Sequence, residues 1–179
     1  MTIPNLDRIV ETFIQVPFEN QVTSINYWQK YVEVLYEKLI PLLDNLIEKQ
    51  LIKSFSFLIH NKDNGVPTSK EDHNPYIHLR LELSENNNEF ELIKNLPNYC
   101  LFSRKGSIKP PFTMSGIDSK YLIDEDFRYA WKVLCGCSEL VVEILKVHKD
   151  KNLPIKHVAQ FLHFLGNQFF VSLINIPMP

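Results

Sequence analysis

Strict alternation of apolar and polar side chains over Tyr76–Leu83 constrains the fold of this chain more than any other feature. The run reads Y-I-H-L-R-L-E-L, so a branched aliphatic residue stands at every second position. A period of two is typical of a β-strand with one apolar face and one polar face. The polar face is either ordinary half-exposed sheet or the floor of a site for an anionic or polar ligand.

A second strand-like run precedes this one, and the segment between them has the composition of a loop. Ile52–Ile59 reads I-K-S-F-S-F-L-I, and residues 61–74 contain Asn64-Gly65 and Pro67. Glycine and proline at such positions are turn signals. We therefore expect an antiparallel hairpin whose loop is longer than usual.

Apolar residues at three- and four-residue steps indicate helices on both sides of this hairpin. Helices are expected at about 23–50 (interrupted by Pro41), 89–96, 124–149 and 155–173, with a short strand at 99–102. Residues 1–22 are assigned to an N-terminal arm or short element that covers one edge of the core, and residues 23–175 to the core itself. This order predicts an α+β fold, in which a small antiparallel sheet packs against several helices in a single domain of residues 1–179.

The composition excludes several classes of function. The chain has 179 residues, enough for one domain with a sizeable core, and a net charge of −2 argues against a nucleic-acid binder with a broad basic patch. The N-terminus lacks the pattern of a signal peptide, and no apolar run is long enough to cross a bilayer. We expect a cytoplasmic protein with no membrane span.

The cysteines do not predict a metal site. Cys135 and Cys137 are two residues apart on an expected helix and point to nearly opposite sides, and Cys100 has no ligand-spaced partner. Buried cysteine acting as a small apolar residue is the better interpretation. The chain also lacks the phosphate-binding and nucleophile motifs that would indicate a cofactor or a hydrolase. No metal and no cofactor are expected.

Titratable side chains gather on the predicted strand pair. The first run ends at His60, and the polar positions of the second are Tyr76, His78, Arg80 and Glu82. A buried guanidinium needs an anionic or multiply accepting partner, and Glu82 lies two residues from Arg80 on the same face. These two residues form either an internal ion pair or, with the histidines, part of a ligand site.

Several short blocks share their residues and their order with one protein family. The strand P-Y-I-H-L-R-L-E-L is similar to P-x-x-H-L-R-L-R-F, and F-S-F-L-I-H-N stands in place of W-x-F-x-R-Y. The helix D-E-D-F-R-Y-A-W-K-V-L-C-G-C-S-E-L-V-V-E-I-L matches a segment containing D-S-E, and F-L-H-F-L-G-N-Q matches L-x-H-M-H-x-N-R. From about residue 27 to 175, this order resembles the C-terminal domain of lantibiotic dehydratases, a domain also found in stand-alone proteins of thiopeptide biosynthesis.

The resemblance implies peptide-tailoring chemistry. In the dehydratases this domain eliminates glutamate from glutamylated Ser or Thr, and a related thiopeptide protein joins two dehydroalanines in a formal four-plus-two cyclisation. By motif match, Arg80 would bind or polarise the leaving carboxylate, and His163 would act as an acid or base. The nearby substrate-binding candidates are His60, Tyr76, His78 and Glu82.

Two arginines and one histidine of the family pattern are missing. His60-Asn61 stands at the family's R-Y, and Leu165 and Gln168 replace the second His and the Arg of the last motif. We expect a stand-alone peptide-tailoring protein of the elimination or cyclisation type, with a precursor or leader peptide and a partner biosynthetic enzyme as its partners. The alternatives are a non-catalytic peptide- or protein-binding module of the same fold and a structural subunit of a biosynthetic complex.

Overall fold

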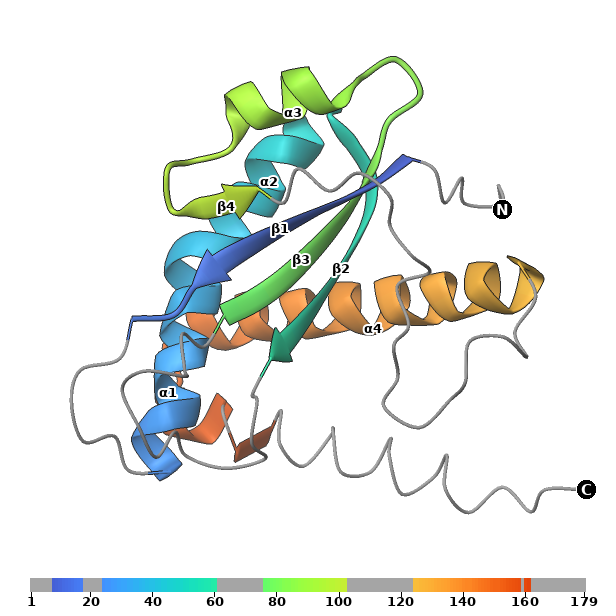
Figure 1. Ribbon diagram of the computed structural model, residues 1–179. Helices are drawn as coiled ribbons and strands as arrows, with labels where there is room; N and C mark the ends of the chain where they lie inside the picture. The colour runs from blue at the N-terminus through green and yellow to red at the C-terminus, as the bar shows by residue number, and fades with distance from the viewer. Residues whose placement is uncertain (1–7, 18–23, 61–75, 103–123, 159, 162–179) are drawn as a thin grey trace, which may run out of the picture.

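The computed structural model describes residues 8–17, 24–60, 76–102, 124–158 and 160–161. Figure 1 shows a sheet backed by helices, with one long helix running across it. The elements in chain order are β1 Ile9–Gln15, α1 Ser24–Val34, the π-helical turn η2 Leu35–Leu39, α2 Ile40–Glu48, β2 Ile52–His60, β3 Tyr76–Leu83, α3 Glu89–Asn95, β4 Cys100–Phe102 and α4 Asp124–Asp150.

The four strands form one antiparallel sheet in the order β2-β3-β1-β4. Strand β3 pairs with β2 on one side and with β1 on the other, and β4 pairs with the outer side of β1. Strands β1 and β2 are thus separated by β3, which is the split β-α-β arrangement of ferredoxin-like folds. The predicted α+β class and the predicted antiparallel pairing of the two strand-like runs are confirmed.

The assignment of residues 1–22 to an arm is wrong for Ile9–Gln15, which form an interior strand of the sheet. Ile9, Val10 and Phe13 have the spacing of a helix face, but both faces of β1 are partly covered, so apolar residues occur on each. An interior strand of this kind does not show clean alternation. The spacing of these residues alone therefore did not indicate a strand.

The apolar face of the sheet packs against α1, η2 and α2, as Figure 1 shows. Ile77, Leu79 and Leu81 of β3 are completely buried there, together with Ile14 of β1. Leu92 of α3 closes one end of the same core. Residues that alternate along the strands thus supply one continuous hydrophobic core.

The interruption predicted at Pro41 takes the form of a π-helical turn. Leu35–Leu39 form η2 directly before α2, and Pro41 stands in the first turn of α2. Proline has no N–H and its ring clashes with the carbonyl four residues back, so a wider turn before it relieves the helix. The helical segment therefore continues through Pro41, and α2 still packs against the apolar face of the sheet.

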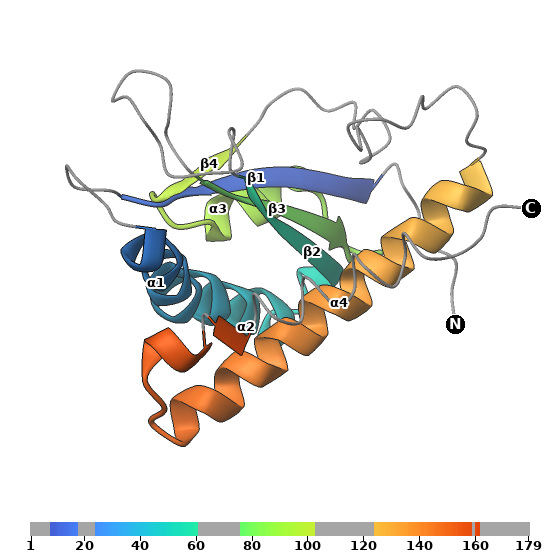
Figure 2. The same cartoon turned by 90° about the horizontal axis from the view of Figure 1, so that it is seen from below.

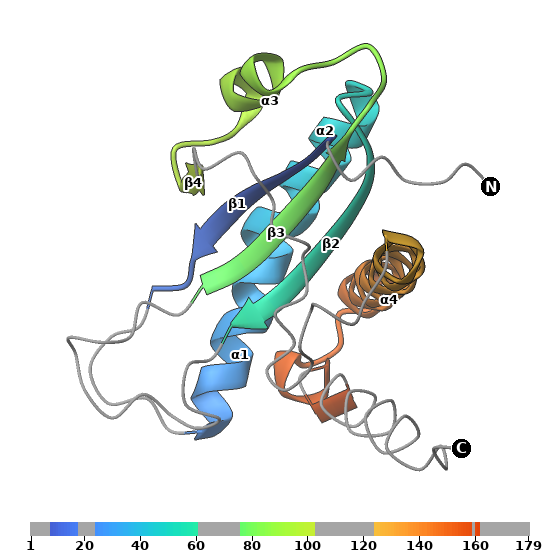
Figure 3. The same cartoon turned by 45° about the vertical axis from the view of Figure 1, so that its right-hand side comes forward.

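Helix α4 passes from one face of the sheet to the other beside the edge strand β2, as Figures 2 and 3 show. Its N-terminal half places Trp131 and Cys135 against Ile9 on the polar face. Its C-terminal half places Val142 and Leu145 in the main core. The predicted helix over this segment is confirmed, and no helix in the described parts of the chain is long and apolar enough to span a membrane.

The expected last helix lies mostly outside the described residues. Residues 155–158 and 160–161 are helical, and the remainder of 155–173 is not described. The long loop expected at 61–74 also lies outside the described part of the chain.

Candidate functional site

The polar face of the sheet is built by three neighbouring strands. Antiparallel register places Glu11 of β1 and Ser56 of β2 on either side of Arg80, and Phe13 of β1 beside His78. Side chains of paired residues point to the same face of a sheet. The register alone therefore brings an acid, an arginine, a hydroxyl and a histidine together.

Arg80 is the centre of this cluster, which we call the Arg80 cluster: Glu11, Phe13, Ser56, Tyr76, His78 and Arg80. The arginine is only 6% exposed, and its Nε donates to Glu11 Oε1 at 3.3 Å. Burial lowers the pKa of the guanidinium, although the charge of Glu11 opposes that effect. Arginine stays protonated at any physiological pH, so the cluster contains a permanent buried cation.

His78 shares the carboxylate of Glu11 with Arg80. Its Nε2 lies 3.2 Å from Glu11 Oε1, within ion-pair distance. The imidazole stacks on Phe13, with ring centroids 4.7 Å apart and an interplanar angle of 19°, and Phe13 meets Tyr76 edge-on at 5.2 Å. The aromatic contacts and the carboxylate together fix the position of the imidazole.

The charge of Glu11 is stabilised by both of its neighbours. Interaction with His78 is the largest effect that lowers the pKa of Glu11, and Arg80 lowers it further, while partial burial opposes them. Glu11 is therefore a carboxylate at neutral pH. The same charge adds to the effect of burial in raising the pKa of the Tyr76 hydroxyl.

Two buried polar atoms of the Arg80 cluster have no hydrogen-bond partner among the described residues: Arg80 Nη1 and Ser56 Oγ. His78 Nε2 also makes no hydrogen bond of good geometry, but it lies at ion-pair distance from Glu11. Elsewhere in the described fold, such atoms occur on Tyr36 and His148. A buried polar group left without a partner costs about 1–3 kcal/mol. Two such atoms on adjacent strands are typical of a site whose partner is an external ligand with hydrogen-bond acceptors.

The other end of the polar face is internally satisfied. Ser54 Oγ donates to Glu82 Oε2 at 2.5 Å and accepts from Trp131 Nε1 at 3.2 Å, and Lys53 Nζ lies 3.9 Å from Glu82 Oε1. Burial raises the pKa of the nearby Cys135 thiol to about 12. This end of the face fastens α4 to the sheet and has the character of a structural contact.

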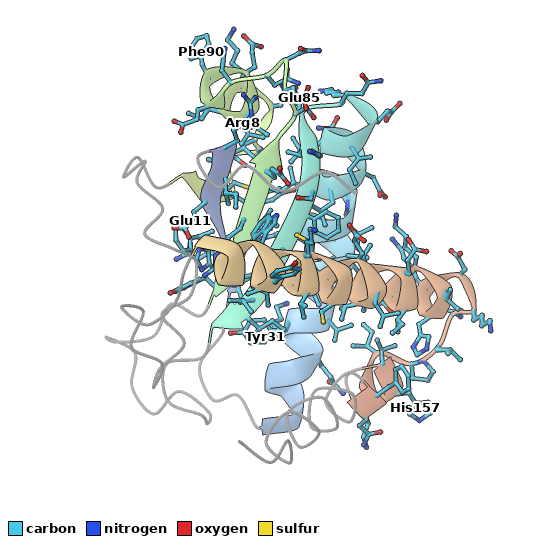
Figure 4. The ribbon with its side chains drawn as sticks, turned by 90° about the vertical axis from the view of Figure 1, so that its right-hand side faces the viewer. Arg8, Glu11, Tyr31, Glu85, Phe90 and His157 are labelled. Atoms are coloured by element: carbon cyan, nitrogen blue, oxygen red, sulfur yellow. The ribbon has the colours of Figure 1, made fainter. Side chains whose placement is uncertain are left out.

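Strand β1, which carries Glu11, is anchored at its start by Arg8. The Arg8 guanidinium donates to the backbone carbonyls of Ser84, at 2.5 Å, and Asn87, at 2.7 Å, in the connection between β3 and α3. Figure 4 shows Arg8 close to α3 and Glu11 further along the strand. The anchor fixes the register that places Glu11 opposite Arg80.

The structure brings together three of the residues predicted from sequence. Arg80, His78 and Tyr76 lie on one face, whereas Glu82 belongs to the satisfied end. His60 pairs with Tyr76 through the backbone of β2, but its side chain is not among those described. The last predicted residue, His163, lies outside the described part of the chain.

Sequence reasoning missed Glu11, Phe13 and Ser56. Glu11 and Phe13 lie on the strand that had been assigned to an arm, and Ser56 lies on a predicted strand but was not singled out. The alternating polar positions of β2, Ser54 and Ser56, were the available signal. A strand pairing for residues 9–15 would have added the other two.

The described side chains contain no group of three or more His, Cys, Asp or Glu that could hold a metal ion. The side chains described on the polar face can donate and accept hydrogen bonds, carry charge and transfer protons. Compared with protein-family models, with curated proteins and with solved structures, the chain finds no match.

Proposed function

We propose that the chain is a peptide-tailoring protein that binds a modified Ser or Thr residue of a precursor peptide at the Arg80 cluster and eliminates its acyl substituent. The main support is the buried, incompletely paired guanidinium of Arg80, whose Nη1 has no hydrogen-bond partner among the described residues. The resemblance of P-Y-I-H-L-R-L-E-L to the dehydratase strand supplies the substrate class. His78 and Arg80, the two polar residues shared with that strand, point to the same face.

Arg80 fits the recognition of a leaving carboxylate. Its Nε is occupied by Glu11, and Nη1 remains for a ligand oxygen. The hydroxyl of Ser56, which stands opposite Arg80 in the register, supplies a second polar group beside it. Charge-assisted hydrogen bonds in a buried site are strong, and they strengthen as negative charge develops on the leaving group.

His78 fits the role of the base. Elimination removes the α-proton of the modified residue, forms the Cα–Cβ double bond and breaks the Cβ–O bond, so that the acyl group leaves as a carboxylate. A neutral imidazole accepts the proton, and the carboxylate of Glu11 at 3.2 Å stabilises the imidazolium that results. In this mechanism His78 acts as the base, either in place of His163, to which the resemblance gave the role of acid or base, or together with it.

A second candidate is a non-catalytic peptide-binding module. The ion pair between Arg80 and Glu11 compensates the charge of the cluster, and this favours a neutral acceptor such as a peptide carbonyl over a carboxylate. On this alternative the cluster binds a leader peptide or a partner enzyme, and the unpaired donors supply specificity.

The experiment that tests the proposal uses a synthetic peptide in which one serine carries glutamate as an ester. The wild-type protein is incubated with this peptide, and mass spectrometry follows the loss of glutamic acid. We expect loss with the wild type, and at least about a hundredfold slower loss with Arg80→Met and with His78→Asn. The matched control is Lys94→Met, which removes a surface cation on α3 far from the polar face.

The competing outcomes are distinct. If elimination proceeds at the same rate in Arg80→Met and in the control Lys94→Met, the assignment of the site to Arg80 is wrong. No mass change with the wild type, combined with peptide binding that Arg80→Met abolishes, would replace the enzyme by the binding module. Circular dichroism of each variant separates a lost site from a lost fold.

A further inference from the structure

The outer side of α4 carries an apolar stripe that no part of the described fold covers. Tyr129 and Val133 are 67% and 64% exposed, and Leu140 and Val147 are 47% and 44% exposed. Val133, Leu140 and Val147 are seven residues apart in succession, the repeat of a helix seam that packs against another helix. Trp131, which is buried, lies on the opposite side of the helix. Figure 2 shows the sheet, α1 and α2 on one side of α4 only.

Gly136 lies within the stripe and opens it to a close neighbour. The position is exposed, and a Cβ atom added there would meet nothing within 4 Å. A glycine inside a helix costs about 1 kcal/mol relative to alanine. Without a side chain at this point, the backbone of a second helix can approach α4 closely.

Lys132 and Glu139, which are seven residues apart, flank the stripe on the same side. Neither forms an ion pair within the described part of the chain. Lys132 Nζ lies 5.7 Å from the centre of the Tyr129 ring. Lys146, one heptad further on, is by contrast held by Asp44 at 2.7 Å. Lys132 and Glu139 are therefore not committed to an ion pair among the described residues.

We propose that the chain forms a homodimer in which two α4 helices pack antiparallel through this stripe. When Leu140 is placed against the partner's Tyr129, Val133 faces the partner's Gly136. The same register places Lys132 beside the partner's Glu139, and the two-fold axis repeats that pair on the other side. Side chains of small and large size then alternate across the seam.

Charge complementarity selects this occupant and this direction. In a parallel pair, the flank that carries Lys132 and Glu139 would lie on opposite sides of the seam in the two helices, so neither lysine would meet a glutamate of the partner. The antiparallel register instead gives two opposite-charge contacts from a single lysine and a single glutamate. A surface that is complementary to itself in both shape and charge is the requirement of an isologous interface.

The test measures the association of the full chain by sedimentation equilibrium over about a hundredfold range of concentration. We expect the wild type to show a concentration-dependent dimer, and Leu140→Asp to remain a monomer. Lys132→Glu and Glu139→Lys should each weaken dimerisation at least about tenfold, because like charges then face each other. Glu85→Lys, which changes an exposed charge elsewhere on the surface, should leave it unchanged.

Mixing the two charge variants gives the decisive result. Lys132→Glu has acidic side chains at both flanking positions, and Glu139→Lys has basic side chains at both. An equimolar mixture should therefore form a heterodimer, although neither variant dimerises alone. The proposal is overturned if the wild type is a monomer throughout the range, or if its dimer survives Leu140→Asp. Failure of the mixture to associate while the wild type dimerises would overturn the antiparallel register.

Discussion

Both faces of the sheet bury side chains at the middle of β3, but they differ in what that burial does. On the face packed against α1 and α2, Leu79 and Leu81 are completely buried among other apolar side chains. On the opposite face, Arg80 and Ser56 are nearly as inaccessible, yet each has a polar atom without a partner. Burial stabilises the first face and costs free energy on the second. The comparison indicates that the apolar face stabilises the fold, whereas the polar face carries the candidate site.

The largest effect is expected from a cavity on the apolar face. Leu79→Ala should lower the free energy of unfolding by about 3 kcal/mol, because it removes buried methyl groups and leaves a cavity in the core. The matched control is Leu58→Ala on the polar face of β2, where the side chain is 39% exposed and the expected loss is below about 1 kcal/mol. Urea denaturation measures both variants.

If the two variants lose the same free energy of unfolding, the proposed difference between the two faces is wrong. If Leu79→Ala costs less than Leu58→Ala, the hydrophobic core does not lie where the burial of β3 places it.

The next largest effect is expected from uncoupling the charges of the Arg80 cluster. Glu11→Gln leaves the buried guanidinium of Arg80 without a carboxylate and should destabilise the protein by about 2 kcal/mol. The double variant Glu11→Gln/Arg80→Met removes both charges, and it should recover most of that loss. If the double variant is instead as unstable as the sum of both single variants, the pair contributes to stability in its own right.

The pH dependence of stability should report the same carboxylate. The pKa of Glu11 is lowered from 4.5 in the fold, so its stabilising contribution is complete above pH 4.5 and disappears as the pH falls through the lowered pKa. We expect the wild type to lose free energy of unfolding in this acid range, and Glu11→Gln to lose less. Chemical denaturation at a series of pH values measures the difference. Identical acid profiles would show that Glu11 is not the charged partner.

The sequence predicted the strands of the hairpin because one face of each is apolar and the other polar. Tyr76–Leu83 alternates without exception, and the structure confirms it as β3. Ile9–Gln15 was missed because an interior strand that is covered on both faces carries apolar residues on both, and Ile9, Val10 and Phe13 then imitate a helix.

The sequence predicted the residues of the candidate site that lie on one strand, but not their partners on the neighbouring strands. Arg80 and His78 were recognised as polar positions on a strand, but their partners come from other strands, through a register that no local pattern contains. Glu82, two residues away, was one candidate for the partner of Arg80, whereas the ion pair described is with Glu11, which is distant in sequence. A side chain paired across the sheet is nearer in space than one along the strand.

The smallest effect is expected at the point where α4 joins the two faces. The backbone N–H of Phe57 in the edge strand β2 donates to Ser138 Oγ at 3.1 Å, so a helix side chain satisfies a group that a further strand would otherwise pair. Ser138→Ala should lower the free energy of unfolding by about 1 kcal/mol, since the buried N–H loses its acceptor. Cys137→Ala, at the exposed neighbouring position, should change it by less than about 0.5 kcal/mol. Hydrogen exchange at the Phe57 amide gives the direct readout. Faster exchange in Ser138→Ala alone would show that the serine hydroxyl protects this N–H. Equal exchange in both variants would show that packing of α4 protects it instead.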